Sequence, residues 1–247
     1  MLSDRQPLAR FKFFTLAAAL GCIVAVASLM TAHAEPTPAA KANSPHHLQT
    51  ALGVNVDYCQ EWLDGGDLKS LKQTAEGLLL LADVLQARSG DPAWQKGIGE
   101  LRSETAALIK SAGGDKLEEC RQQLPKVAAA AARLAAQPFP GEAADYKNLR
   151  PAAGLKSMMV LLDGTHADAK RAVLFDEFAS ARESAATLAE LGMLLANYRG
   201  DAQWKKHADA FIGESEKVAQ LTSDDAQVYR NALGGIYNQC EACHNRR

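Results

Sequence analysis

The residues best suited to chemistry stand near the C-terminus, where the sequence reads Cys240-Glu241-Ala242-Cys243-His244. Cys-x-x-Cys-His is the pattern by which a c-type haem is attached to a protein chain. The two thiols add to the haem vinyl groups, and the imidazole of the following histidine is then placed to ligate the iron. Cys240 and His244 share a helix face because they are four residues apart. The motif therefore predicts one haem c, bound covalently by Cys240 and Cys243, with His244 as an axial iron ligand.

A Cys-x-x-Cys pair can also serve as a redox dithiol or as half of a zinc site. A thioredoxin-like dithiol stands near a β-α-β pattern, and nothing in the sequence suggests one. A zinc site needs a fourth ligand and usually a second paired motif, and no such motif is visible in the sequence. Haem attachment is therefore the preferred interpretation.

Residues 1–34 have the three parts of a secretory signal: early basic residues, an apolar run from Phe13 to Met30, and Ala32-His33-Ala34 before Glu35. We expect cleavage after Ala34 and export to the periplasm or an equivalent oxidising space. One alternative is an uncleaved membrane anchor, because the run approaches spanning length. Another is a lipid on Cys22, although this cysteine lies within the apolar run and not at its end.

The composition indicates packed helices, with abundant alanine, few β-branched runs and only 6% aromatic residues. The formal net charge of −2 gives no reason to expect nucleic-acid binding. Residues 35–45 predict a flexible lead-in because proline recurs in them. From the turn signals that follow, we expect helices at residues 46–64, 67–88, 92–111, 115–136, 146–163, 167–198, 202–221 and 225–245.

An internal repeat relates the two halves of this helical region. Gly90-Asp91-x-x-Trp94-x-Lys96 recurs 110 residues later as Gly200-Asp201-x-x-Trp204-x-Lys206, and Asp64-Gly65 recurs 99 residues later as Asp163-Gly164. The difference of 11 residues predicts a longer second helix or an extra loop in the second half. We interpret the chain as all-α, with two tandem antiparallel four-helix bundles. A single eight-helix domain with a coincidental repeat is the alternative.

The predicted domains are a first bundle at 46–137, a linker at 138–145 and a second bundle at 146–247, which carries the covalent haem. The offset of 110 places Ala130, Arg133 and Leu134 opposite the three residues of the haem motif. The first bundle should therefore be free of haem, and the chain should hold one haem and not two.

Two further cysteines belong to the first bundle. Cys59 lies late in the first expected helix and Cys120 lies early in the fourth. These helices are antiparallel neighbours in an up-down-up-down bundle, so both cysteines should lie at the same end. Because an oxidising compartment favours disulfides, we predict a Cys59–Cys120 bond, with two buried thiols as the alternative.

A helical bundle with its haem motif at the extreme C-terminus resembles the cytochrome c-prime family, including its low-spin six-coordinate relatives. The likeness covers about residues 146–247, and the last helix carries it, since Tyr229-Arg230-Asn231-Ala232-Leu233-Gly234 leads into Cys240 and His244. The resemblance implies a periplasmic protein whose haem is attached by the cytochrome c maturation machinery. It also implies pairing as a homodimer. The additional first bundle is a departure that could replace this dimer contact.

In that family the position across the iron lies on the first helix of the bundle. A methionine there gives a low-spin electron carrier, and a leucine leaves the iron five-coordinate and open to small gases. Here the segment is Leu155-Lys156-Ser157-Met158-Met159. The family spacing puts Leu155 at the ligand position; read without it, Met158 or Met159 is the ligand. Both methionines can also simply fill gaps in the core.

Other candidate ligands are weaker. Met193 lies beside the apolar stripe of its helix, and His166 and His207 each stand alone, which favours surface or capping roles. The sequence thus predicts a non-enzymatic c-type cytochrome that passes single electrons to redox partner proteins. The alternatives are a five-coordinate haem protein that binds nitric oxide or carbon monoxide, and a peroxidase. A peroxidase needs a distal acid–base group, and Asp163 alone stands near that position.

Overall fold

The computed structural model describes residues 46–139, 145–146 and 149–244. The predicted signal segment and lead-in lie outside the described residues. Over the described part of the chain the secondary structure is entirely helical, as the composition predicts. The elements are α1 His46–Asp64, α2 Leu68–Arg88, α3 Pro92–Gly113, α4 Leu117–Ala135, α5 Leu155–Leu174, α6 Phe178–Leu195, the 3-10 turn η1 Ala196–Tyr198, α7 Ala202–Ala219 and α8 Ala226–His244.

The repeated Gly-Asp-x-x-Trp sequence forms the same turn twice. Asp91 caps α3 by accepting a hydrogen bond from the Trp94 amide at 2.9 Å, and Asp201 caps α7 by accepting one from the Trp204 amide at 2.7 Å. Each indole N–H donates to a backbone carbonyl nine residues earlier, at 3.1 and 2.8 Å. The tryptophan therefore fastens the end of one helix to the start of the next in both halves.

The expected helices at 146–163 and 167–198 are wrong. Helix α5 runs through Asp163 and Gly164 without a break, and the turn comes at Asp176, whose φ is 58°. Gly66 has φ 72° in the first half and stands 110 residues earlier. The offset is therefore constant, and no extra loop exists at this turn. A glycine inside a helix costs only about 1 kcal/mol, which packing overrides, and aspartate tolerates the left-handed region.

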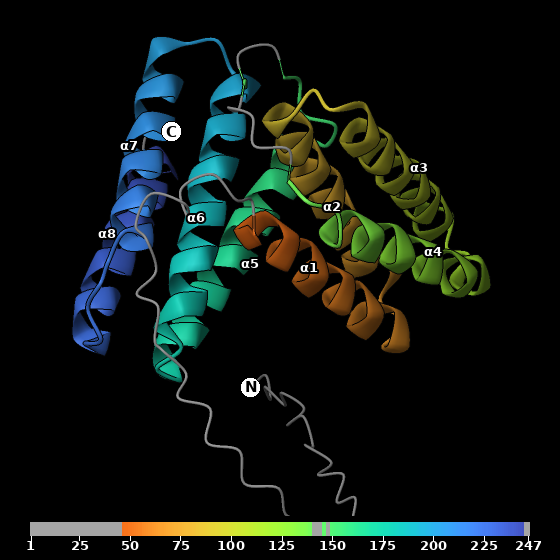
Figure 1. Ribbon diagram of the computed structural model, residues 1–247, viewed down its shortest axis with the longest axis horizontal. Helices are drawn as coiled ribbons and strands as arrows, with labels where there is room; N and C mark the ends of the chain where they lie inside the picture. The colour runs from red at the N-terminus through yellow and green to blue at the C-terminus, as the bar shows by residue number, and fades with distance from the viewer. Residues whose placement is uncertain (1–45, 140–144, 147–148, 245–247) are drawn as a thin grey trace, which may run out of the picture. The chain divides into compact units, whose positions relative to one another are not determined.

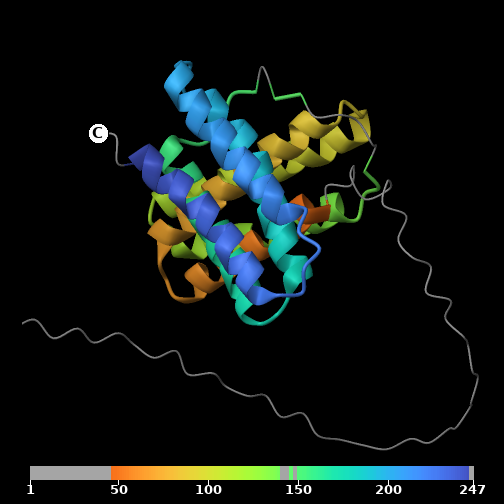
Figure 2. The ribbon, with the colours of Figure 1, turned by 90° about the vertical axis from the view of Figure 1, so that its left-hand side faces the viewer.

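Helices α1–α4 pack on one another in a closed order, in which each contacts the next and α4 contacts α1. Helices α5–α8 repeat this order. The two groups meet through α1 and α2 on one side and α5 and α6 on the other. As Figures 1 and 2 show, α7 and α8 form the outer pair beside α5 and α6. The buried apolar side chains make one continuous cluster across both groups.

The contact between the groups has approximate two-fold symmetry. Tyr58 on α1 donates to Asp168 Oδ1 on α5 at 2.5 Å, and these positions are 110 residues apart. Ser157 on α5 donates to a carboxylate on α2, whereas Thr187 on α6 donates to the His47 carbonyl on α1 at 3.2 Å. The first of these contacts maps onto the second, to within one residue, when the offset is applied. The groups thus meet through equivalent surfaces, as the subunits of a two-fold dimer do.

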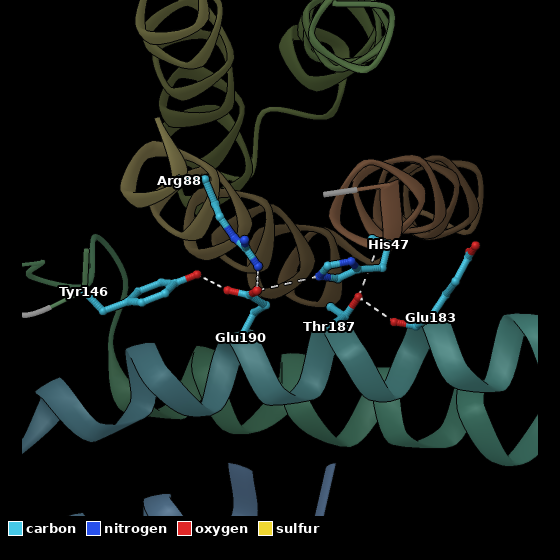
Figure 3. A network of polar contacts seen from close by, with 6 residues as sticks. All are labelled: His47, Arg88, Tyr146, Glu183, Thr187 and Glu190. Carbon is cyan, nitrogen blue, oxygen red and sulfur yellow. Dashed lines mark hydrogen bonds and ion pairs between the residues drawn. The ribbon is translucent and has the colours of Figure 1, made fainter. Parts of the chain in front are cut away.

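A buried polar cluster breaks this symmetry (Figure 3). Glu190 on α6, only 6% exposed, pairs with Arg88 and accepts a hydrogen bond from Tyr146 in the connecting segment. His47 Nε2 lies 3.9 Å from the same carboxylate and has no hydrogen-bond partner. Burial, together with the nearby Arg88 charge, lowers the pKa of His47 to about 4, so this imidazole is neutral at pH 7.

A second buried carboxylate also holds the connecting segment. Asp83 on α2 has no exposed surface, and it accepts hydrogen bonds from Arg102 at 2.5 Å and from the Ala152 amide at 2.6 Å. Tyr198 donates to the Ala153 carbonyl at 2.7 Å. The segment before α5 is therefore attached to both groups of helices.

The predicted Cys59–Cys120 disulfide is wrong, because both cysteines are free thiols. Each side chain is fully buried in the apolar core. Burial raises the pKa of Cys59 to about 12, and it also raises that of Cys120. Both residues thus pack as small apolar side chains in their unreactive, protonated form.

Candidate haem site

Helix α8 positions the haem motif through its own amphipathic pattern. Its buried residues are Tyr229, Leu233 and Ile236, which follow a helical spacing of three and four residues. Continuing that spacing reaches Cys240 and Cys243, which are half-buried and pack against the core. The inner face of α8 therefore carries both thiols, at the end where the helix leaves the core.

The two thiols border a cavity between α5, α7 and α8. The space between the side chains amounts to about 560 Å³, including a part open to solvent, which is within the range of cofactor pockets. His244 lies at its edge. The lining is largely apolar and consists of Met159, Leu162, Asp163, Leu195, Trp204, His207, Ala208, Phe211, Gln239, Cys240, Cys243 and His244.

This set of residues fits a covalent haem. Two thiols and an imidazole, which are the groups that attachment requires, border one cavity. Trp204 and Phe211 supply large flat apolar surfaces within it. Helix α7 presents them there because they lie on its buried face, at a spacing of seven residues. The donors and the apolar walls thus occur together, as a large hydrophobic macrocycle needs.

The thiol chemistry does not suit a redox dithiol. Burial, with contributions from the Asp163 carboxylate and Cys243, raises the pKa of Cys240 to about 11. A reactive dithiol needs the opposite, a lowered pKa that yields thiolate at neutral pH. Among the residues that the structure describes, no three His, Cys, Asp or Glu side chains are grouped so as to hold a metal ion.

The three candidates for the position across the iron are placed differently. Met159 lines the cavity with the haem motif. Met158 is fully buried in the core and is not part of the lining, and Leu155 is half-buried against the core near the start of α5. Adjacent helical residues point about 100° apart, so only one of the two methionines can face the cavity.

Two polar residues of the cavity were not recognised in the sequence. Asp163 lies one helical turn after Met159, and the supposed turn at Asp163-Gly164 hid this relation. His207 lies on α7, where its Nε2 is 2.9 Å from the amide nitrogen of Gln203. Its distance of three residues from Trp204 was the available signal. His166 lies outside the cavity, with its ring stacked on Tyr237 at 6.5 Å.

The corresponding place in the first group is filled. Leu134, the counterpart of His244, is fully buried, and Ala130 replaces Cys240. A Cβ atom placed on Gly97, the counterpart of His207, would lie 3.2 Å from the Leu134 side chain. A leucine packed against a glycine thus takes the space that borders the cavity in the second group.

Comparison with known proteins gives no further guide. No protein-family model, characterised protein or solved structure is significantly similar to the chain. Within the described residues, none of the helices has both the length and the apolar character needed to cross a bilayer. A functional assignment therefore depends on the residues of the site and on their geometry.

Proposed function

We propose that the chain is an exported monohaem c-type cytochrome that transfers single electrons. In this proposal it consists of two tandem antiparallel four-helix bundles, and the second holds the haem in the periplasm after attachment by the maturation machinery. One observation carries the proposal: Cys240, Cys243 and His244 border the same apolar cavity as Met159, which comes from a different helix.

Each residue then has a defined part. The sulfur of Cys240 or Cys243 adds to one vinyl carbon and the thiol hydrogen goes to the other carbon, so attachment needs no oxidant. His244 ligates the iron through its imidazole, and Met159 is the candidate for the opposite position. Haem supplies one-electron chemistry when bound, and a methionine thioether raises its reduction potential.

The remaining lining controls the surroundings of the cofactor. Leu162, Trp204 and Phe211 exclude water, and this apolar environment disfavours the more highly charged ferric state. Asp163 is exposed at the cavity, where its carboxylate acts in the opposite sense by favouring positive charge. The reduction potential thus depends on the balance between the apolar walls and this single carboxylate.

The gas-binding alternative depends on Leu155 as the residue across the iron. Leu155 does not belong to the cavity lining, so its position gives this alternative no support. A peroxidase activity would require Asp163 or His207 to act as a distal acid or base. His207 is partnered by Gln203 on its own helix, and neither residue is presented to a substrate channel that we can identify.

Absorption spectra test the proposal when the chain is exported in a host that matures c-type cytochromes. We expect a low-spin reduced spectrum that carbon monoxide leaves unchanged. Met159→Leu should give a high-spin spectrum that carbon monoxide shifts, whereas Met158→Leu, the matched control, should remain low-spin. A high-spin, carbon-monoxide-sensitive wild type would favour the gas-binding alternative. Absence of any covalent haem would reject the proposal.

A further inference from the structure

A groove between α5 and α8 lies outside the haem cavity and combines apolar and basic side chains. Its rim is unusually apolar for exposed positions: Leu174 is 68% exposed, Phe175 66% and Tyr237 52%. Exposed apolar groups gathered in one place commonly mark an interaction site. The cationic lining residues are Lys170, Arg171 and Arg230, and none of the described residues that line the groove is a carboxylate.

The related surface of the first group has the opposite character. Asp64 and Gly65 stand where the second group has Leu174 and Phe175, and Glu61 stands where it has Arg171. The first group also fills the position of Gly234 with Leu124, which is 1% exposed. The shared fold therefore does not require an apolar and basic groove. The second group alone has one.

The groove adjoins the haem cavity along both of its helices. On α5, Asp163 lines the cavity and His166 lines the groove, three residues further on. On α8, Tyr237 lines the groove and Cys240 lines the cavity, again three residues further on. Three residues of helix rise only about 4.5 Å. A molecule bound in the groove would thus lie close to the bound cofactor.

We propose that this groove is the docking surface for an acidic one-electron carrier protein. Its carboxylates would face Lys170, Arg171 and Arg230, and an apolar side chain would pack among Leu174 and Phe175. Charge complementarity speeds the encounter of such partners, and a small apolar contact suits a short-lived complex. The inference rests on the proposed electron-transfer function and adds the partner's chemistry and its binding face.

Stopped-flow reduction of the ferric holoprotein tests the docking surface, with a reduced acidic [2Fe–2S] ferredoxin as the probe. One electron leaves the cluster, which is oxidised, and reduces the haem iron from Fe(III) to Fe(II). We expect the second-order rate constant to fall with rising salt. Lys170→Glu with Arg230→Glu should lower it by about tenfold or more. Leu174→Asp with Phe175→Gly, which installs the residues of the first group, should slow the reaction even at high salt.

Two controls separate the possible failures. Glu61→Lys with Asp64→Lys, on the related surface of the first group, should leave the rate within about twofold, and a small uncharged reductant should reduce every variant equally fast. Unchanged rates in both groove variants, with normal reduction by the small reductant, would reject the groove alone. A chain without reducible haem would reject the electron-transfer function as well. Self-association that the groove variants abolish would overturn the proposal in favour of a second copy.

Discussion

The two groups of four helices share their frame and differ at the ends of their fourth helices. Both use an aspartate cap and a buried tryptophan to join their second and third helices. In the first group Leu134 packs against Gly97, whereas the second group has His244 and His207 at these positions beside an open cavity. Whether such a group of helices is solid or has room for a cofactor is thus decided at a few positions, while the turns stay the same.

The largest expected effect concerns the buried cluster that one half lacks. Glu190→Ala leaves Arg88 buried without its partner, and breaking a buried pair in this way costs about 3–5 kcal/mol. The counterpart of Glu190 in the first group is Leu80, which is fully buried. Urea unfolding of the variant should show the loss. The double variant Arg88→Met with Glu190→Leu should stay within about 1 kcal/mol of the wild type, and an equal loss in both variants would contradict this account of the pair.

The filled and open sites should respond differently to truncation. Leu134→Ala removes a fully buried side chain, which costs about 2–5 kcal/mol. His244 is exposed, so His244→Ala should change the stability of the haem-free protein by no more than about 0.5 kcal/mol. Chemical denaturation of the two variants without haem measures both values. Equal losses would mean that His244 is part of the packed core.

The contact between the groups should weaken in acid. His47 has its pKa lowered to about 4, against an ordinary value of 6.5. The unfolded chain therefore binds a proton that the folded chain excludes, and stability is lost as the pH falls from about 6.5 to about 4. This residue should account for at most about 3 kcal/mol of the loss. His47→Gln should flatten unfolding free energies measured across that range; an unchanged slope would assign the effect to other groups.

The smallest expected effect is one that the halves should share. Asp91→Ala and Asp201→Ala each remove a helix cap whose geometry is nearly the same, at a cost of about 1 kcal/mol. Thermal unfolding of the two single variants should give losses that agree to within about 0.5 kcal/mol. A large difference would show that the repeated turn does not bear the same load in the two groups.

The sequence was sufficient for the helical class, the repeated turn and the spacing of the haem motif, because these depend on short-range patterns. It was insufficient at the end of α5, where Asp163-Gly164 resembles a turn and Asp176 makes the real one. Which of Met158 and Met159 faces the cavity depends on packing between helices, which spacing alone does not show. The disulfide prediction failed because compartment and helix order do not fix the distance between two sulfur atoms.

The intact mass of the exported protein, together with its reduced absorption spectrum, tests the central claim most directly. The cavity lies beside Cys240 and Cys243, and Leu134 packs against Gly97 at the related place in the first group. The account predicts the mass of one covalent haem per chain and a c-type spectrum, both lost in Cys240→Ala with Cys243→Ala and retained in Cys59→Ala with Cys120→Ala. A chain that carries no haem when matured in a competent host, or one that carries two, would contradict it.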